Sequence, residues 1–364
     1  MKKRWTAAHL CGSRFWRETQ VASEYLPCGA LQSKKHLSLR KSLTVADEWR
    51  KVLAGSDVEP GFAKMGESIL ADTPGNAALH AKLLDIGKGR IAHMDDVGVS
   101  MQVLSLTSPG VQVFDADIAT HLAANSNDVL AESVGRAPDR LAGLGAVAPQ
   151  NPLAAASEIG RIKSLGLSGI IVNSHTFGEY LDAPRYTPIF EAMEETSLPM
   201  YLHPREPAPS MVKPFLDYGL YFAGWGFAAE TGLHAMRLIM SGVFARHPKL
   251  KIILGHMGEG IPFWLQRIDN RYLLQVKIGA VQKLPRLPSE YFLENFVITT
   301  AGVTSMPALR LCLDVLGAER ILFAADYPYE DDVEAVQFLR DATVDHQQRE
   351  LISHANAERL LRLN

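Results

Sequence analysis

The sequence predicts an α/β fold, a (β/α)₈ TIM barrel, and three observations lead to this prediction. Short apolar runs recur along the chain, amphipathic helical stretches separate them, and several of the runs end in polar residues. Continuous apolar runs indicate strands buried on both faces, which is typical of parallel sheets. A length of 364 residues is long for an ordinary domain but common for a barrel.

The predicted elements alternate in a regular order. Strands are expected at residues 101–107, 141–149, 169–173, 199–203, 250–255, 296–300 and 321–325. Helical patterns lie between them, for example at 153–165, 183–195, 232–247, 305–316 and 333–342. A barrel has eight strands, so we expect the missing one before a helix at 47–53, with an atypical first strand and N-terminus. A doubly wound open sheet is the competing architecture.

The composition excludes several classes of partner. Hydrophobic residues make up 47% and charged residues 21% of the chain, and the net charge is −3, so no nucleic-acid partner is expected. No apolar run approaches the roughly 18 residues of a membrane helix, and the basic N-terminus leads into residues too polar for a secretion signal. The three cysteines lack disulfide or metal-site spacing, which indicates a reducing, cytoplasmic location.

Four predicted strands end in residues that do not suit a core. These endings are 173–176 (NSHT), 203–205 (HPR), 256–259 (HMGE) and 326–328 (DYP). The carboxyl ends of all strands of a barrel meet at one face, where active sites are built. We therefore expect a site at that face.

Two of these residues suit a divalent metal. His203 follows an apolar strand and precedes a proline that fixes the turn; a core histidine bonded to a backbone carbonyl is the alternative. Asp326 follows another apolar strand, where burial of a carboxylate is costly unless it is paired or bound to a cation. A helix N-cap is the alternative for Asp326.

The glycine-flanked His256 is either a third metal ligand or a group for proton transfer. Glu259 either orients that imidazole or caps the next helix. Arg267 suits bidentate binding of a carboxylate, and a solvated position on a helix face is its alternative. Arg205 is expected to bind an anionic substrate, with a surface salt bridge as the alternative. His175 is expected to line the pocket, with stabilisation of a turn as the alternative.

Residues 222–231 are rich in aromatic and small side chains. Trp225 and Phe227 are expected to line a pocket for an aromatic ring, with core packing or a subunit contact as the alternatives. Tyr329, in the loop after the last strand, is a further candidate for substrate contact.

Several stretches resemble the amidohydrolase-related decarboxylases of hydroxylated benzoic acids. The most specific is 254–269 (LGHMGEGIPFWLQRID), and 201–205 (YLHPR) and 325–330 (ADYPYE) agree with it. The stretches 106–112 (LTSPGVQ) and 173–182 (NSHTFGEYLD) resemble the 5-carboxyvanillate branch more than the γ-resorcylate or 2,3-dihydroxybenzoate branches. The resemblance covers roughly residues 44–364.

The resemblance implies a chemistry and a set of roles. In that family Mn²⁺ or Zn²⁺ is held by a first-strand Glu, a fifth-strand His and an eighth-strand Asp; the last two match His203 and Asp326. His256 matches a residue of proton transfer, and Arg267 a residue that binds the substrate, a small aromatic carboxylate. The metal chelates the phenolate and the carboxylate of the substrate, the ring carbon is protonated, and CO₂ leaves.

The sequence departs from the family pattern at the first strand. The corresponding position reads Ser-Leu-Arg-Lys-Ser-Leu at 38–43, with two cations where an acid is expected. One hypothesis is that residues 1–43 arise from a frameshift or a misassigned start, so that the barrel covers 44–364. Glu24 and His36 are the alternative ligands if the segment is native.

Three functions follow from these observations. The first is the decarboxylase. The second is a hydrolase that uses metal-activated water on a lactone or amide. The third is a catalytically impaired barrel, which only the missing first-strand acid favours. Exposed apolar helix faces further suggest a homodimer or homotetramer.

Overall fold

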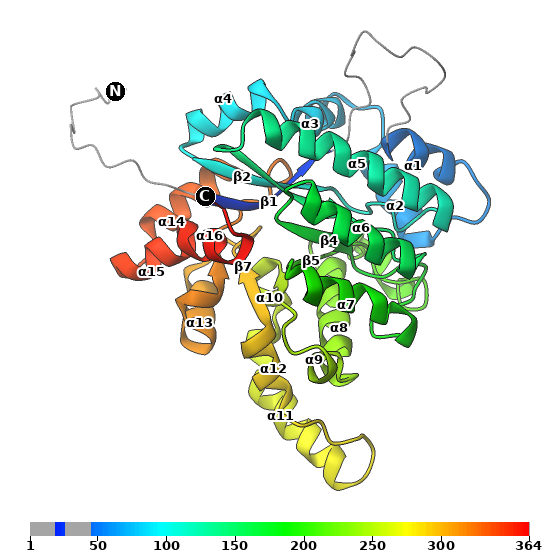
Figure 1. The fold of residues 1–364 in the computed structure, drawn as a ribbon, viewed down its shortest axis with the longest axis vertical. Coiled ribbons are helices and arrows are strands. Elements are labelled where there is room, and N and C mark those ends of the chain that lie inside the picture. The colour runs from blue at the N-terminus through cyan, green and yellow to red at the C-terminus, as the bar shows by residue number, and fades with distance from the viewer. Residues whose placement is uncertain (1–18, 26–44, 364) are drawn as a thin grey trace.

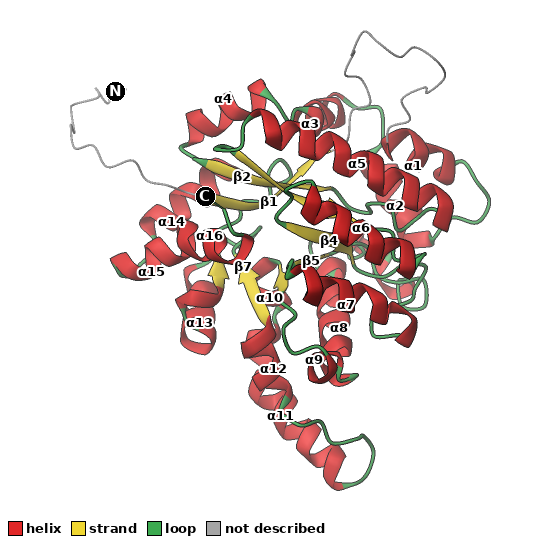
Figure 2. Ribbon diagram, viewed as in Figure 1, coloured by secondary structure: helices red, strands yellow, loops and turns green. Residues whose placement is uncertain are grey.

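The computed structural model describes residues 19–25, as backbone alone, and residues 45–363. Its centre is a sheet of eight parallel strands paired in chain order, with helices around it (Figures 1 and 2). This order is that of a TIM barrel and excludes a doubly wound sheet, where the order reverses. The strands are β1 (Thr19–Tyr25), β2 (Met101–Leu106), β3 (Leu141–Ala146), β4 (Gly169–Asn173), β5 (Met200–His203), β6 (Ile252–Leu254), β7 (Phe296–Thr299) and β8 (Ile321–Leu322).

The helices precede or follow these strands as the sequence alternation predicts. They are α1 (Val45–Leu53), α2 (Pro60–Ile69), α3 (Pro74–Leu84), α4 (Lys88–Val97), α5 (Ala116–Arg136), α6 (Pro152–Ser164), α7 (Thr187–Thr196), α8 (Gly226–Met240), α9 (Val243–Arg246), α10 (His256–Glu259), α11 (Ile261–Lys277), α12 (Pro288–Asn295), α13 (Met306–Leu316), α14 (Asp332–Asp341), α15 (His346–Glu350) and α16 (Asn356–Leu361). Figure 1 shows α11 and α12 extending away from the barrel.

The seven strands expected from apolar runs are confirmed, and their burial explains the pattern. Every residue of β2 to β6 is buried, because helices cover the sheet. Two glycines in β3 allow helices to approach closely. A Cβ on Gly143 would lie 2.7 Å from Leu130 of α5, and one on Gly145 would lie 2.6 Å from Ile162 of α6.

Side-chain contacts join segments near β2 to segments after β8, the last strand of the sheet. The hydroxyl groups of Thr107, after β2, and Tyr329, after β8, are 2.8 Å apart. His93 of α4 pairs with Asp332 of α14 at 2.9 Å. These contacts therefore hold the first and last parts of the sheet to each other through the segments that follow or precede the strands.

The first strand lies upstream of the position at which the sequence analysis placed it. β1 pairs with β2, with Glu24 opposite Ser105 and Tyr25 opposite Leu106. The segment 38–43, which the family resemblance assigned to the first strand, lies outside the described residues. An acidic residue, Glu24, stands near the carboxyl end of β1 after all.

The sheet thus includes part of the segment that we expected to be separate from the barrel. The hypothesis that residues 1–43 come from a frameshift or a misassigned start stays a prediction, since only the coding DNA tests it. One observation that supported it, the lack of an acidic residue in the first strand, no longer holds, because β1 carries Glu24.

Among the helices of the described residues, none has the length and hydrophobicity needed to span a membrane.

Candidate active site

A pocket of about 140 Å³ opens at the carboxyl ends of the strands, the face where the polar strand endings were expected to meet. Three of the expected site residues, His203, His256 and Asp326, lie in its wall. The complete lining is Met65, Ile69, Thr107, Ser108, His203, Pro204, Phe222, Ala223, Phe227, His256, Asp326, Tyr329 and Glu330. Segments that are far apart in the sequence therefore share one small site.

His203 is the last residue of β5 and is buried. Its Nδ1 lies 2.8 Å from the carbonyl oxygen of Pro204. A carbonyl only accepts, so this contact assigns the proton to Nδ1 and the lone pair to Nε2. A backbone bond on one ring nitrogen is how many proteins orient a histidine that binds metal through the other nitrogen.

Asp326 follows β8 in a strained backbone conformation, with a φ of 58°. Its Oδ2 lies 3.7 Å from Nε2 of His256. Burial raises the pKa of the Asp326 carboxyl, but the adjacent imidazole of His256, with a contribution from His203, outweighs burial and lowers it. The carboxylate is therefore negatively charged at neutral pH, as a ligand for a cation must be.

His256 begins a tight turn in which His256, Met257, Gly258 and Glu259 all have positive φ angles. The turn brings Oε1 of Glu259 to 2.8 Å from Nδ1 of His256. Burial lowers the pKa of the imidazole, but the carboxylates of Glu259 and Asp326 outweigh burial and raise it well above its usual value. Of the two roles considered for Glu259, the structure favours orientation of the imidazole.

The donor set of the pocket fits a divalent cation in its chemistry but is incomplete in the described side chains. Within residues 45–363 no three His, Cys, Asp or Glu side chains gather closely enough to hold a metal ion. His203 and Asp326 offer one imidazole nitrogen and one carboxylate at the same rim. The backbone of β1 adds a third candidate, because Glu24 is paired with Ser105 near the carboxyl end of β2.

The remaining wall combines apolar and hydroxyl groups. Phe227 and Tyr329 lie in the pocket as expected, while their contact with a substrate stays a prediction. The sequence analysis missed several lining residues. Thr107, Ser108 and Glu330 belong to stretches that carried the family resemblance, whereas Met65 and Ile69 of α2 carried no signal.

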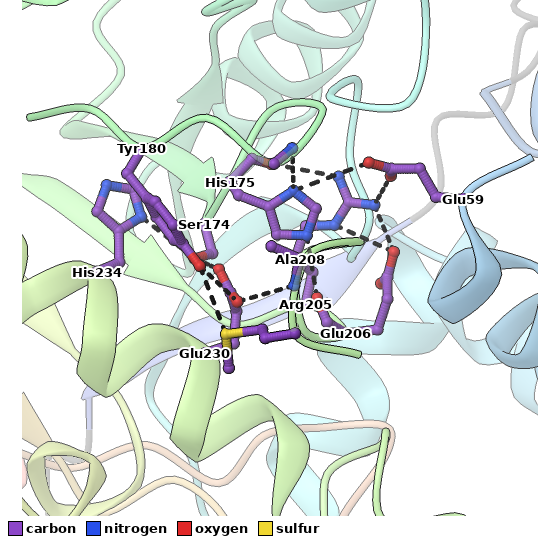
Figure 3. Close-up of polar contacts among 11 residues, drawn as sticks. Glu59, Ser174, His175, Tyr180, Arg205, Glu206, Ala208, Glu230 and His234 are labelled. Atoms are coloured by element: carbon purple, nitrogen blue, oxygen red, sulfur yellow. Dashed lines mark hydrogen bonds and ion pairs between the residues drawn. The ribbon is translucent and has the colours of Figure 1, made fainter. Parts of the chain in front are cut away.

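Two expected substrate contacts have other partners instead. Arg205 is fully buried and binds the carboxylates of Glu59 and Glu206, so it neither lines the pocket nor forms a surface salt bridge (Figure 3). His175 is also buried; its Nε2 lies 3.1 Å from the carbonyl of Glu206, and its Nδ1 accepts from the backbone of Gly178. His175 does not line the pocket, and its contacts are those of the turn-stabilising alternative.

Two more expected contacts lie on the outer surface. Trp225 and Arg267 line a groove of about 580 Å³ between α8 and α11, together with Leu233, Trp264 and Ile268. Neither residue lines the pocket that holds His203 and Asp326. Trp225 is 61% exposed, so its expected place in the ring pocket is wrong for a single chain. Arg267 occupies the exposed helix position that was its alternative.

A second buried network, around Glu230 of α8, lies beside the Arg205 cluster (Figure 3). Its carboxylate accepts hydrogen bonds from Ser174, from Tyr180 and from the backbone of Ala208. Burial raises the pKa of Glu230 from 4.5 to about 7, although these hydrogen bonds oppose the shift. A carboxyl group with a raised folded-state pKa contributes most stability at low pH.

That contribution is lost as the pH rises from the unfolded pKa through the folded one. We expect the free energy of unfolding to fall by about 2–3 kcal/mol more in the wild type than in Glu230→Gln between pH 5 and pH 8. Urea denaturation at the two pH values measures this difference. Equal pH dependence in the two proteins would show that Glu230 is ionised with an ordinary pKa.

The chain is similar to several known proteins. The family model described as Amidohydrolase matches residues 79–363. The γ-resorcylate decarboxylase of Rhizobium radiobacter is 40% identical over 302 residues, which cover 79% of this chain and 90% of that protein.

Solved structures of decarboxylases are similar over almost the whole chain. The 5-carboxyvanillate decarboxylase of Sphingomonas paucimobilis is 41% identical with a TM-score of 0.88, covering 96% of this chain and 99% of that one. The corresponding enzyme of Novosphingobium aromaticivorans, in complex with manganese and 4-hydroxy-3-methoxy-5-nitrobenzoic acid, is 34% identical with a TM-score of 0.88. The match covers 96% of each chain.

Proposed function

We propose that this chain, which belongs to the amidohydrolase family, is a metal-dependent decarboxylase that removes CO₂ from a hydroxylated benzoic acid. The observation that carries the proposal is the meeting of His203, His256 and Asp326 in one pocket with an apolar wall. The relatives named above, all decarboxylases of hydroxybenzoates, support the same reaction. A 5-carboxyvanillate-like or dihydroxybenzoate-like acid is the proposed substrate.

His203 and Asp326, with Glu24 of β1, are the proposed ligands of Mn²⁺ or Zn²⁺. Manganese in the Novosphingobium relative supports the first of these ions. When bound, the cation supplies a Lewis acid and a template for the phenolate and carboxylate of the substrate.

His256 is the proposed proton-transfer residue of this chain. The carboxylate of Glu259 keeps a proton on Nδ1, so Nε2 is the nitrogen that faces Asp326 and the pocket. In the reaction the ring carbon that bears the carboxylate first takes a proton, which an imidazolium at this position is placed to deliver. The bond between that carbon and the carboxylate then breaks, CO₂ leaves, and the electron pair of the broken bond restores the aromatic ring.

The aromatic ring is proposed to lie against Phe227 and the apolar side chains of Met65 and Ile69. Ser108 offers a buried hydroxyl group with no hydrogen-bond partner among the described residues. Burial of a hydroxyl group without a partner is costly, so a polar substituent of the substrate is a fitting partner.

Release of CO₂ tests the proposal. Purified protein loaded with Mn²⁺ is incubated with 5-carboxyvanillate, γ-resorcylate and 2,3-dihydroxybenzoate, and again after treatment with a chelator. We expect CO₂ from at least one acid, loss of activity on chelation, and recovery on addition of Mn²⁺. A protein that instead hydrolyses lactones or amides, without releasing CO₂, would refute the decarboxylase and establish the hydrolase.

Substitution of Glu259 by glutamine tests the orientation of His256. The amide keeps the size of the side chain but removes the charge that raises the pKa of the imidazole. We expect kcat to fall about 10–100-fold, as for other partners that orient site histidines. The exposed Glu290 of α12 provides the matched control, since Glu290→Gln should leave kcat unchanged. Unchanged kcat in Glu259→Gln would contradict the role.

A homodimer or homotetramer in the cytoplasm is part of the same proposal. The groove between α8 and α11 presents exposed Trp225 and Trp264, and Phe263 beside it is 66% exposed. Such a large exposed apolar patch is more typical of a subunit interface than of a monomer surface. Sedimentation analysis tests the assembly, and a monomer at micromolar concentration would contradict it.

A further inference from the structure

The buried cluster around Arg205 joins two parts of the chain that both line the pocket (Figure 3). Arg205 lies two residues after the candidate ligand His203. Glu59 lies directly before α2, whose Met65 and Ile69 form the apolar wall. The contact between Arg205 and Glu59 spans 146 positions of the sequence. It therefore ties the wall to the loop after β5.

The geometry of the cluster is specific. The guanidinium group of Arg205 donates to Glu59 and Glu206 through Nη2, to Glu206 through Nε, and to the carbonyl of His175 through Nη1. Arg205 is 0% and Glu206 1% exposed, so water does not replace these bonds. Glu59 is the N-cap residue of α2, yet its side chain makes no capping hydrogen bond and reaches Arg205 instead.

The first turn of α2 also fits tightly against the same cluster. A Cβ on Gly61 would lie 2.4 Å from Cγ and 3.0 Å from Cβ of Glu206. Glu206 is held by Arg205 and has little freedom to move aside. Close approach therefore requires a glycine at this position. The contact between the start of α2 and the loop after β5 therefore depends both on charge pairing and on steric fit.

We propose that Glu59, Gly61, Arg205 and Glu206 form a latch that seats α2 on the loop after β5 and thereby sets the affinity of the pocket for its aromatic ligand. Glu59 and Gly61 are positioning residues, because they act through Met65 and Ile69 and do not themselves line the pocket. The identity of the ligand rests on the proposed function, whereas the seating of α2 does not.

The test uses two variants that disturb the latch by different means. Glu59→Gln removes the charge that pairs with Arg205, and Gly61→Ala adds the clash with Glu206. Alanine is the better helix former, so Gly61→Ala stabilises α2 itself while it weakens the packing of α2 against the loop after β5. Substitution of Arg205 is less informative, since it would leave two carboxylates without a counter-ion and threaten the fold.

Matched controls make the same changes elsewhere. Asp95→Asn breaks an exposed ion pair with Arg140 that also joins distant segments. Gly160→Ala adds a Cβ in a helix where no atom lies within 4 Å. Neither residue touches the pocket.

Four quantities are measured on the full chain: the Kd for Mn²⁺, the Kd of the Mn²⁺-loaded protein for 4-hydroxy-3-methoxy-5-nitrobenzoic acid, KM and kcat. In both latch variants we expect the ligand Kd and the KM to rise about tenfold, with kcat and the Mn²⁺ Kd changed less than about threefold. The controls should match the wild type. An unchanged ligand Kd, or a parallel loss of Mn²⁺ affinity, would overturn the latch.

Hydrogen exchange separates failure of the latch from failure of the proposed function. Amides of residues 60–69 should exchange faster in Glu59→Gln and Gly61→Ala than in the controls, while β5 stays protected. This readout needs neither substrate nor turnover, so it decides the seating of α2 even if the wild type binds no ring and releases no CO₂. Unchanged exchange in α2 would refute the latch on its own.

Discussion

Replacement of Asp326 by asparagine is expected to lower kcat/KM by about a thousandfold or more, because it removes a candidate ligand and the counter-charge of His256 together. Asparagine has the same shape and tolerates the left-handed backbone that Asp326 adopts, at a φ of 58°. The fold should therefore remain, and the loss should be chemical.

The measurement compares CO₂ release by the two proteins at saturating Mn²⁺, so that lower occupancy alone does not explain the difference. Asp331→Asn is the matched control in the same loop. Asp331 caps α14 by accepting from Val333 and Glu334, and asparagine caps a helix equally well. If Asp326→Asn kept more than about a tenth of the wild-type activity, the central role of Asp326 would be refuted.

The architecture was predictable because burial on both faces leaves a mark on each strand. Seven continuous apolar runs identified β2 to β8, and the polar residues after them identified the rim. Convergence of His203, His256 and Asp326 followed from the barrel alone, since all carboxyl ends of parallel strands share one face. Chain order and periodicity carry this information without any knowledge of distant contacts.

The errors concern contacts that chain order does not encode. Arg205 looked available for an anion because its partner Glu59 is remote in sequence. Trp225 and Arg267 follow the right motifs, but the direction of a side chain on a helix depends on the packing of that helix. In each case the side chain has the chemistry that the predicted role requires, but the residues that it contacts in the fold could not be predicted from the sequence.

The first strand was not located from the sequence for a different reason. Its sequence, TQVASEY, mixes polar and apolar residues instead of forming an apolar run. Its pairing with β2 also shifts register between Gln20 and Ser23, so no simple alternation marks it. The family resemblance then drew attention to 38–43, where two basic residues stand, and away from Glu24.

Glu24→Gln is accordingly the second substitution with a large expected effect. We expect the Kd for Mn²⁺ to rise about a hundredfold and CO₂ release at limiting Mn²⁺ to fall in proportion. A neutral amide attracts a divalent cation far less than a carboxylate does at the same position. Glu132→Gln on the exposed face of α5 makes the same change away from the site and should bind Mn²⁺ as the wild type does.

A companion variant makes the result decisive about the first strand. Arg40→Glu with Lys41→Glu restores two acids at 38–43, residues that lie outside the described part of the chain. If β1 supplies the ligand, these substitutions should leave Mn²⁺ affinity unchanged, because the third carboxylate is already present in Glu24. If instead they tighten Mn²⁺ binding while Glu24→Gln has no effect, the missing acid belongs near residue 40. That result would support the hypothesis of a frameshift in residues 1–43, because Arg40 and Lys41 would then occupy positions where the metal site requires an acid.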